Sequence, residues 1–63
     1  MKKVCWVTYD KDRNIWFLKI QDGIREKEET VYHFYTEGRY VDANILRAIN
    51  KLIDEKYVFI GII

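Results

Sequence analysis

Three acidic and amide side chains near the start of this 63-residue chain have the spacing of metal ligands. Asp10, Asp12 and Asn14 alternate like the first ligands of an EF-hand calcium loop. That loop also needs glycine at its sixth position and glutamate at its twelfth, where this chain has Ile15 and Gln21. Asp and Asn also favour turns, because their side chains bond to nearby backbone groups. We therefore predict a polar hairpin turn here, without a metal.

A second candidate for chemistry is the pair formed by the lone histidine and the lone cysteine. His33 is the candidate general base at neutral pH and Cys5 the candidate nucleophile, but their spacing matches no nucleophile–base arrangement. One histidine and one cysteine cannot supply the four ligands of a structural zinc site, and the three glycines are isolated. We predict that His33 is structural, and that the chain has no catalytic residue, cofactor or metal.

The strands that would position these side chains are indicated by segments rich in β-branched and aromatic residues. Such segments predict strands at Val4–Tyr9, Ile15–Gln21 and Thr30–Thr36. Short polar segments separate them, so consecutive strands should pair as an antiparallel meander. Large apolar residues alternate onto both faces of these strands, and the excess on one face is a candidate partner or ligand surface.

A helix is predicted between these strands and the end of the chain. Asp42 is a suitable N-cap, since its carboxylate accepts from the first free backbone amides, and the helix should end near Glu55. Apolar residues recur at helical spacing and predict one buried face. These residues are Ile45, Leu46, Ile49, Leu52 and Ile53.

The last predicted strand, Tyr57–Ile63, is almost continuously apolar. A continuous apolar strand is typical of one covered on both faces, whereas a single helix covers only one face of a sheet. A core of this size is also marginal by itself. We therefore expect a second copy of the chain to supply the missing cover, in a homodimer. The candidate interface residues are Tyr57, Phe59, Ile60, Ile62 and Ile63.

The fold expected from these elements is a single α+β domain spanning residues 1–63. Its order is β-β-β-α-β, with an antiparallel sheet, one helix packed on one face, and dimerisation through the sheet and the C-terminal strand. A hydrophobic content of 49% argues against disorder, and a net charge of +1 argues against a DNA mimic or a typical duplex binder. No segment has the pattern of a signal peptide or a membrane span, so we expect a cytoplasmic protein without a membrane partner.

In general character, the chain resembles small phage-encoded accessory proteins, including those that inhibit bacterial defence systems. The resemblance covers the whole chain and rests on short length, the absence of proline, richness in Lys, Ile and Tyr, and the compact α+β pattern. It implies a non-enzymatic protein that acts stoichiometrically on a host protein. No functional residue is carried over from it.

Aromatic and arginine side chains concentrate binding energy in protein interfaces, so we select residues of these types that we expect outside the helix-packed core as candidates for partner binding. They are Trp16, Arg25, Tyr32 and Arg39. A first alternative is a single-stranded nucleic-acid-binding module that stacks bases on an aromatic sheet face. That face would be formed by Trp6, Trp16, Tyr32, Phe34 and Tyr35. A second alternative is a small antitoxin-like regulator.

Overall fold

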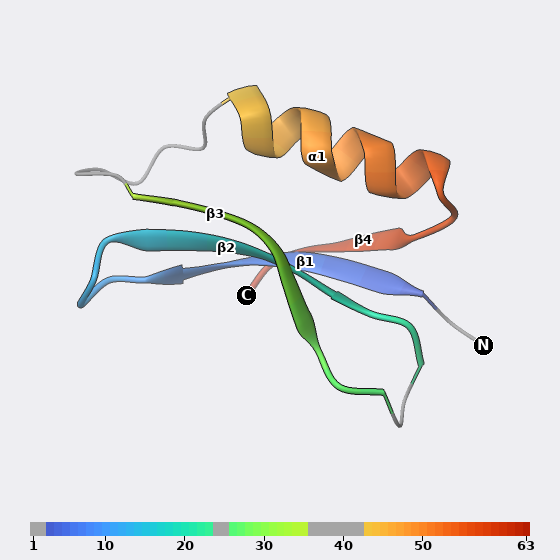
Figure 1. The fold of residues 1–63 in the computed structure, drawn as a ribbon, viewed down its shortest axis with the longest axis horizontal. Helices are drawn as coiled ribbons and strands as arrows, with labels where there is room; N and C mark the ends of the chain where they lie inside the picture. Colours follow the sequence, from blue (N-terminus) through green and yellow to red (C-terminus); the bar gives the residue numbers. More distant parts are fainter. Residues whose placement is uncertain (1–2, 24–25, 36–42) are drawn as a thin grey trace.

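The computed structural model describes residues 3–23, 26–35 and 43–63, and shows four strands and one helix (Figure 1). The order is the predicted β-β-β-α-β, which confirms the α+β class. Within the described residues, each strand boundary lies within one residue of its predicted position. The predicted helix cap, Asp42, lies outside them. The elements are β1 (Val4–Asp10), β2 (Ile15–Gln21), β3 (Glu29–Tyr35), α1 (Ala43–Asp54) and β4 (Val58–Ile62).

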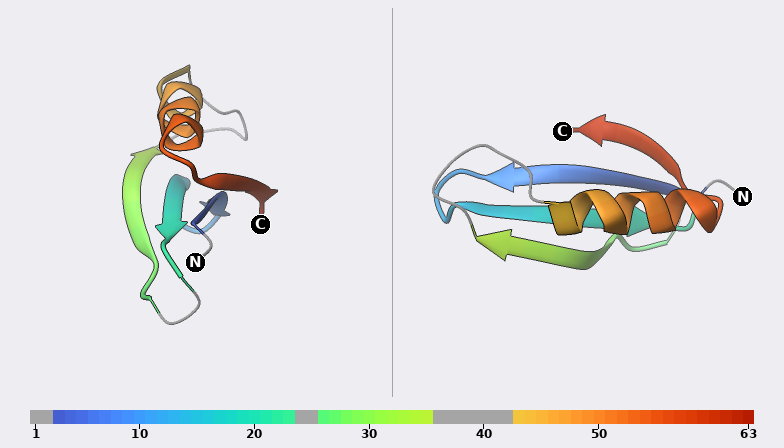
Figure 2. Two further views of the ribbon diagram at one scale, coloured as in Figure 1. Left: turned by 90° about the vertical axis from the view of Figure 1, so that its right-hand side faces the viewer. Right: turned by 90° about the horizontal axis from the view of Figure 1, so that it is seen from above.

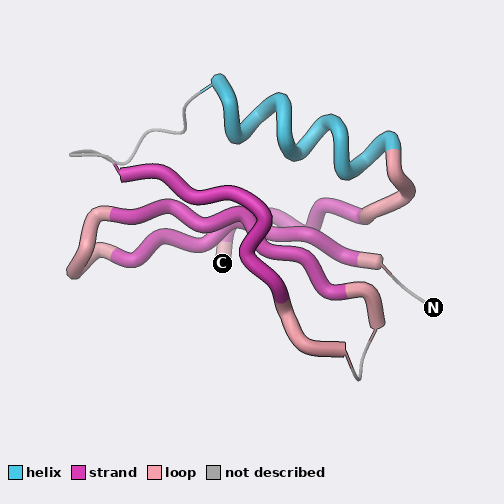
Figure 3. The backbone as a smooth tube through the Cα atoms, in the orientation of Figure 1, coloured by secondary structure: helices cyan, strands magenta, loops and turns pink. Residues whose placement is uncertain are grey.

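The strands form one sheet in the order β3-β2-β1-β4. β1, β2 and β3 pair as the predicted antiparallel meander, but β4 pairs parallel to β1. The sheet is therefore mixed, and the expectation of an antiparallel sheet was wrong for its last strand. The cause is α1, which returns the chain along the sheet (Figure 3), so that β4 runs in the direction of β3 (Figure 2). Such a crossover is the usual connection between parallel strands.

The helix covers one face of the sheet (Figure 2), and the buried core residues come from both the helix and the strands. Alternate residues of β1 and β2 point toward α1, and among them Cys5, Val7 and Leu18 are almost completely buried. Tyr9, Tyr32, Phe34 and Ala48 pack around this core. The buried core cluster consists of Cys5, Val7, Trp16, Leu18, Ile20, Ile45, Ile49, Leu52 and Tyr57.

The helix is buried along a narrower stripe than the sequence predicted. Ile45, Ile49 and Leu52 face the sheet as expected. Leu46 and Ile53, however, are 53% and 46% exposed, so their predicted burial was wrong. At 100° per residue, these two side chains lie on one flank of α1, about 90° from Ile45. A single helix resting on one sheet buries the stripe that faces the sheet and leaves that flank uncovered.

Candidate partner-binding surface

Among the described residues, no helix lies over the sheet face opposite α1, and we call it the open face. Its residues alternate along each strand with the core residues. Strand register brings Trp6 opposite Lys19, Thr8 opposite Phe17, and Phe17 opposite His33. The open face includes Val4, Trp6, Thr8, Ile15, Phe17, Lys19, His33 and Tyr35, and of these Ile15 is buried.

Three rings on β2 and β3 form a continuous row on the open face. The ring centroids of Phe17 and His33 are 6.3 Å apart, and those of His33 and Tyr35 are also 6.3 Å apart. Tyr35 is 72% exposed, His33 is exposed and Phe17 is half-buried. Exposed aromatic rings held on a rigid sheet have the character of anchors in protein interfaces, because each offers a large contact area with few rotatable bonds.

Lys19, the cation beside this row, already has an acidic partner. Its Nζ lies 5.8 Å from the ring centroid of Phe17 and 2.9 Å from Oε1 of Glu28. The carboxylate neutralises the charge that Lys19 would otherwise present. The surface around the row is therefore aromatic and close to neutral.

The structure describes two of the four predicted partner-binding residues, Trp16 and Tyr32. Trp16 is buried and therefore not available for recognition. It is 5% exposed, under the helix, with its ring centroid 4.8 Å from that of Tyr9 and 6.5 Å from that of Phe34. The prediction that Trp16 lies outside the helix-packed core was wrong, because the alternation of β2 turns it inward. Tyr32 is half-buried at the boundary between β3 and α1. Arg25 and Arg39 lie outside the described residues.

The aromatic platform proposed for nucleic acid is also divided by the sheet. Trp16, Tyr32 and Phe34 lie on the helix side and pack in or against the core. Trp6 and Tyr35 lie on the open face. The ring row that does form on the open face includes Phe17 and His33, which we had not selected for recognition; the alternation of β2 and β3 was the available signal.

The candidate dimer residues separate into one core residue and four exposed ones. Tyr57 is 8% exposed, and its hydroxyl donates to Oδ1 of Asp22 at 2.5 Å. This bond to a carboxylate, together with desolvation, raises the pKa of Tyr57 to about 12. Tyr57 therefore stabilises its own chain. The exposed fractions of the others are 37% for Phe59, 51% for Ile60, 63% for Ile62 and 71% for Ile63.

The Asp10 segment forms the predicted turn. Oδ1 of Asp10 accepts from the backbone amides of Asp12 and Arg13, while Oδ2 accepts from Nε of Arg13 at 2.8 Å. The Arg13 side chain, by this bond, lowers the pKa of Asp10. Asn14 has a φ of 56° and its Oδ1 accepts from the hydroxyl of Tyr9. The side chains of Asp10 and Asn14 thus shape the turn.

The remaining chemical candidates are dispersed. Cys5 is fully buried, and burial raises the pKa of its thiol, which keeps it protonated at neutral pH. His33 lies on the open face among rings, on the opposite side of the sheet from Cys5. In residues 3–23, 26–35 and 43–63, no group of three or more His, Cys, Asp and Glu side chains is arranged to hold a metal ion.

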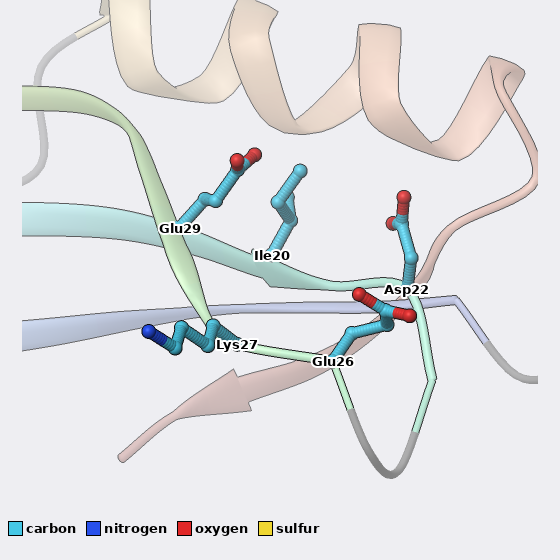
Figure 4. Close-up of a pocket in the computed structure, with 5 residues that line it drawn as sticks. All are labelled: Ile20, Asp22, Glu26, Lys27 and Glu29. Carbon is cyan, nitrogen blue, oxygen red and sulfur yellow. The ribbon is translucent and has the colours of Figure 1, made fainter.

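A small cavity beside the second hairpin contains several acidic groups (Figure 4). The carboxylate of Asp22 already accepts from Tyr57 there, and Lys27 points away from Ile20 and Asp22. The lining residues are Ile20, Asp22, Glu26, Lys27 and Glu29. A cavity of about 90 Å³ holds a few water molecules, and it is too small for an organic substrate.

Within the part of the chain that the structure describes, no helix is long and apolar enough to cross a membrane. Among the described residues, the open face and the edge formed by β4 are extended apolar surfaces, and a function can be based on them. A scan against protein-family models, a search of curated proteins and a search of solved structures each returned no match to this chain.

Proposed function

We propose that this protein is a non-enzymatic, homodimeric binding protein that covers a surface of another protein with its open face. The observation that carries this proposal is the row of rings formed by Phe17, His33 and Tyr35, which lies on two paired strands and has no helix over it in the described part of the chain. Burying such rings is worth about 1.5–3 kcal/mol for a side chain the size of Phe. A protein surface with apolar pockets is the partner that uses this energy best.

The electrostatics of the open face favour a protein over single-stranded nucleic acid. A nucleic-acid groove combines stacking rings with cations that follow the phosphates. Here Lys19 is paired with Glu28, and the whole chain carries a net charge of only +1. A base could stack on Phe17, but its phosphate would meet a neutralised lysine. We therefore keep nucleic acid as the outcome that a direct test can reveal.

The class of target that we propose is a host protein, with this chain acting as a phage-type inhibitor of a defence protein. The support is the general resemblance to small phage accessory proteins, together with a binding surface that needs no chemistry to act. Such an inhibitor works by occlusion, so its effect should follow the molar ratio of inhibitor to target and should not accumulate with time.

The proposal is tested by capture of the target with open-face variants. Immobilised wild-type protein should retain a host protein at a fixed molar ratio. Tyr35→Ala and Phe17→Ala should lower that retention at least tenfold while keeping the wild-type circular dichroism. Lys51→Ala is the matched control, because it removes an exposed side chain of α1, on the other side of the sheet.

Equal retention by all three variants would refute the open face as the recognition surface. Binding of a labelled single-stranded oligonucleotide, weakening steeply with salt and lost in Phe17→Ala, would replace the protein target with nucleic acid.

A further inference from the structure

The outer edge of β4 is apolar and has no neighbouring strand among the described residues. Its inner edge is bonded to β1, through bonds such as the one from the amide of Val58 to the carbonyl of Lys3 at 2.8 Å. β4 is the last strand in the sheet order, so its outer backbone groups face away from the sheet (Figure 2). From Val58 to Ile63, moreover, no side chain is polar or charged.

The opposite edge of the sheet, formed by β3, is protected in the way that natural edge strands are. β3 carries Glu29, Thr30 and His33, and its pairing with β2 shifts between Leu18 and Lys19. Charges, polar groups and irregular pairing prevent an edge from adding another strand. The pairing of β4 with β1 is also irregular, with a bulge where the register shifts between Cys5 and Val7, so irregular pairing does not distinguish the two edges. The side chains of β4, however, offer no polar or charged protection, and an exposed apolar edge of this kind is a surface that requires a cover.

The exposed flank of α1 extends this apolar edge. Ala48 and Lys51 line a groove with Val31 of β3. The flank of α1 that carries Ala48 and Lys51 therefore faces β3. Leu46 and Ile53 lie on the other flank by helical geometry, above the β4 side of the sheet. Together with β4 they form what we call the β4 surface. Its residues are Leu46, Ile53, Val58, Phe59, Ile60, Ile62 and Ile63.

We propose that β4 pairs antiparallel with β4 of a second copy, and that this seam joins the two open faces into one surface. The side chains of the β4 surface are 37–71% exposed and all apolar, and a stable interface buries about 800 Å² on each partner, an area that needs a continuous patch of this kind. A two-fold axis brings the same patch of both copies together, so an interface needs a self-complementary patch. A patch that is apolar throughout meets that condition without any charge repulsion.

This seam rests on the homodimer of the proposed function and specifies its geometry. Antiparallel pairing of two identical edge strands places the two-fold axis perpendicular to the sheet. Both helices then lie on one side of a continuous sheet, where Leu46 and Ile53 of one copy approach those of the other. Both open faces lie on the other side, with Val58 beside the seam, since Val58 pairs with Val4. The target would contact one surface built from two chains.

The test compares exposed residues on the two edges of the sheet. The wild-type chain should have about twice its 7.7 kDa mass in light scattering at micromolar concentration. Val58→Lys and Ile60→Lys should each reduce that mass to one chain, because each change would bury lysine charges in an apolar seam, and the two Lys side chains at position 60 would also lie close together. Val31→Lys is the matched control: Val31 is 46% exposed on β3 and Val58 is 50% exposed on β4, and this variant should stay dimeric.

A cross-linking measurement covers the case in which a lysine variant fails to fold. Ile60 is the middle residue of β4, so the seam places Ile60→Cys within disulfide distance of its copy or of the adjacent residue. Cys5 is buried and should not compete. Mild oxidation should cross-link Ile60→Cys at least tenfold faster than Val31→Cys.

If light scattering gives the wild-type protein the mass of one chain, both the seam and the homodimer are refuted. A dimer that persists in both lysine variants, or that cross-links equally through both cysteine positions, would overturn the seam alone. In either case, the capture experiment with open-face variants would still decide whether the protein binds a target.

Discussion

Replacing Ile45 with alanine should remove a large part of the stability of this fold. Ile45 is completely buried between α1 and the sheet. The change deletes three carbon groups worth about 0.8 kcal/mol each, and the cavity left behind raises the usual total to about 2–5 kcal/mol. The higher helix propensity of alanine returns a few tenths of a kcal/mol. We expect a net cost of about 2–4 kcal/mol, from a total stability of roughly 3–9 kcal/mol for a chain of this length.

Urea unfolding followed by tryptophan fluorescence measures this cost, because the buried ring of Trp16 becomes exposed when the core opens. With a slope of about 1 kcal/mol per molar urea, the midpoint should fall by about 2–4 M. Protein concentration must be held constant, since a dimer gains stability with concentration. Ile45→Val removes one carbon group and should cost about 0.5–1.5 kcal/mol.

Arg47→Ala is the control in the same helix, because Arg47 is exposed and its loss should change stability by less than about 0.5 kcal/mol. The reasoning fails if Ile45→Ala costs less than about 1 kcal/mol, or if Arg47→Ala costs as much. Either result would mean that the helix presents a different face to the sheet.

Three further predictions concern single bonds and backbone positions. Tyr57→Phe removes the hydrogen bond to Asp22 and should cost about 1 kcal/mol. Because the pKa of Tyr57 rises to about 12 in the fold, from about 10 when unfolded, its stabilising effect is complete below pH 10. That effect is lost as the pH rises toward 12. The free energy of unfolding, measured by urea titration at alkaline pH, should therefore fall less for Tyr57→Phe than for the parent. The pKa of Asp10 is lowered by Arg13. The contribution of this carboxylate to folding stability is therefore present above about pH 4 and disappears in more acidic solution. Melting curves of Asp10→Asn and wild type should therefore converge as the pH falls toward 2, whereas a constant difference would contradict the role of the charge. Gly61 has a φ of 104° and open space where a β-carbon would lie, so Gly61→Ala should cost about 1–3 kcal/mol through backbone strain alone, and unchanged stability would show that the β4 bulge can re-form.

The positions of the strands and the helix could be predicted from the sequence because they depend on local periodicity. Alternation along Ile15–Gln21 assigned Phe17 and Leu18 to opposite faces, and the structure confirms that division. The turn after β1 was also predictable, since Asp10 bonds to amides only two and three residues away. Each of these features is decided by neighbours in the chain, which is the information that a sequence pattern contains.

The candidate site was less predictable, because alternation divides residues into two faces without saying which face the helix will cover. We assigned Trp16 to recognition and it lies in the core, while the exposed row includes Phe17 and His33. The choice between the faces follows from the direction in which the chain crosses over the sheet after β3. That direction depends on packing between segments that are distant in sequence.

By itself, the sequence determined the order β-β-β-α-β, the polar turn at Asp10, and the apolar excess that a single helix leaves uncovered. Only the tertiary structure decided that β4 joins β1 in parallel, at the edge of the sheet, where its side chains remain exposed. Hydrogen-bond pairing between strands is non-local, and β1 and β4 are more than forty residues apart. Either edge of the three-stranded meander offered the backbone N–H and C=O groups with which β4 could pair. Helix α1 settled the choice, because its buried stripe of Ile45, Ile49 and Leu52 had to rest on the sheet before β4 began.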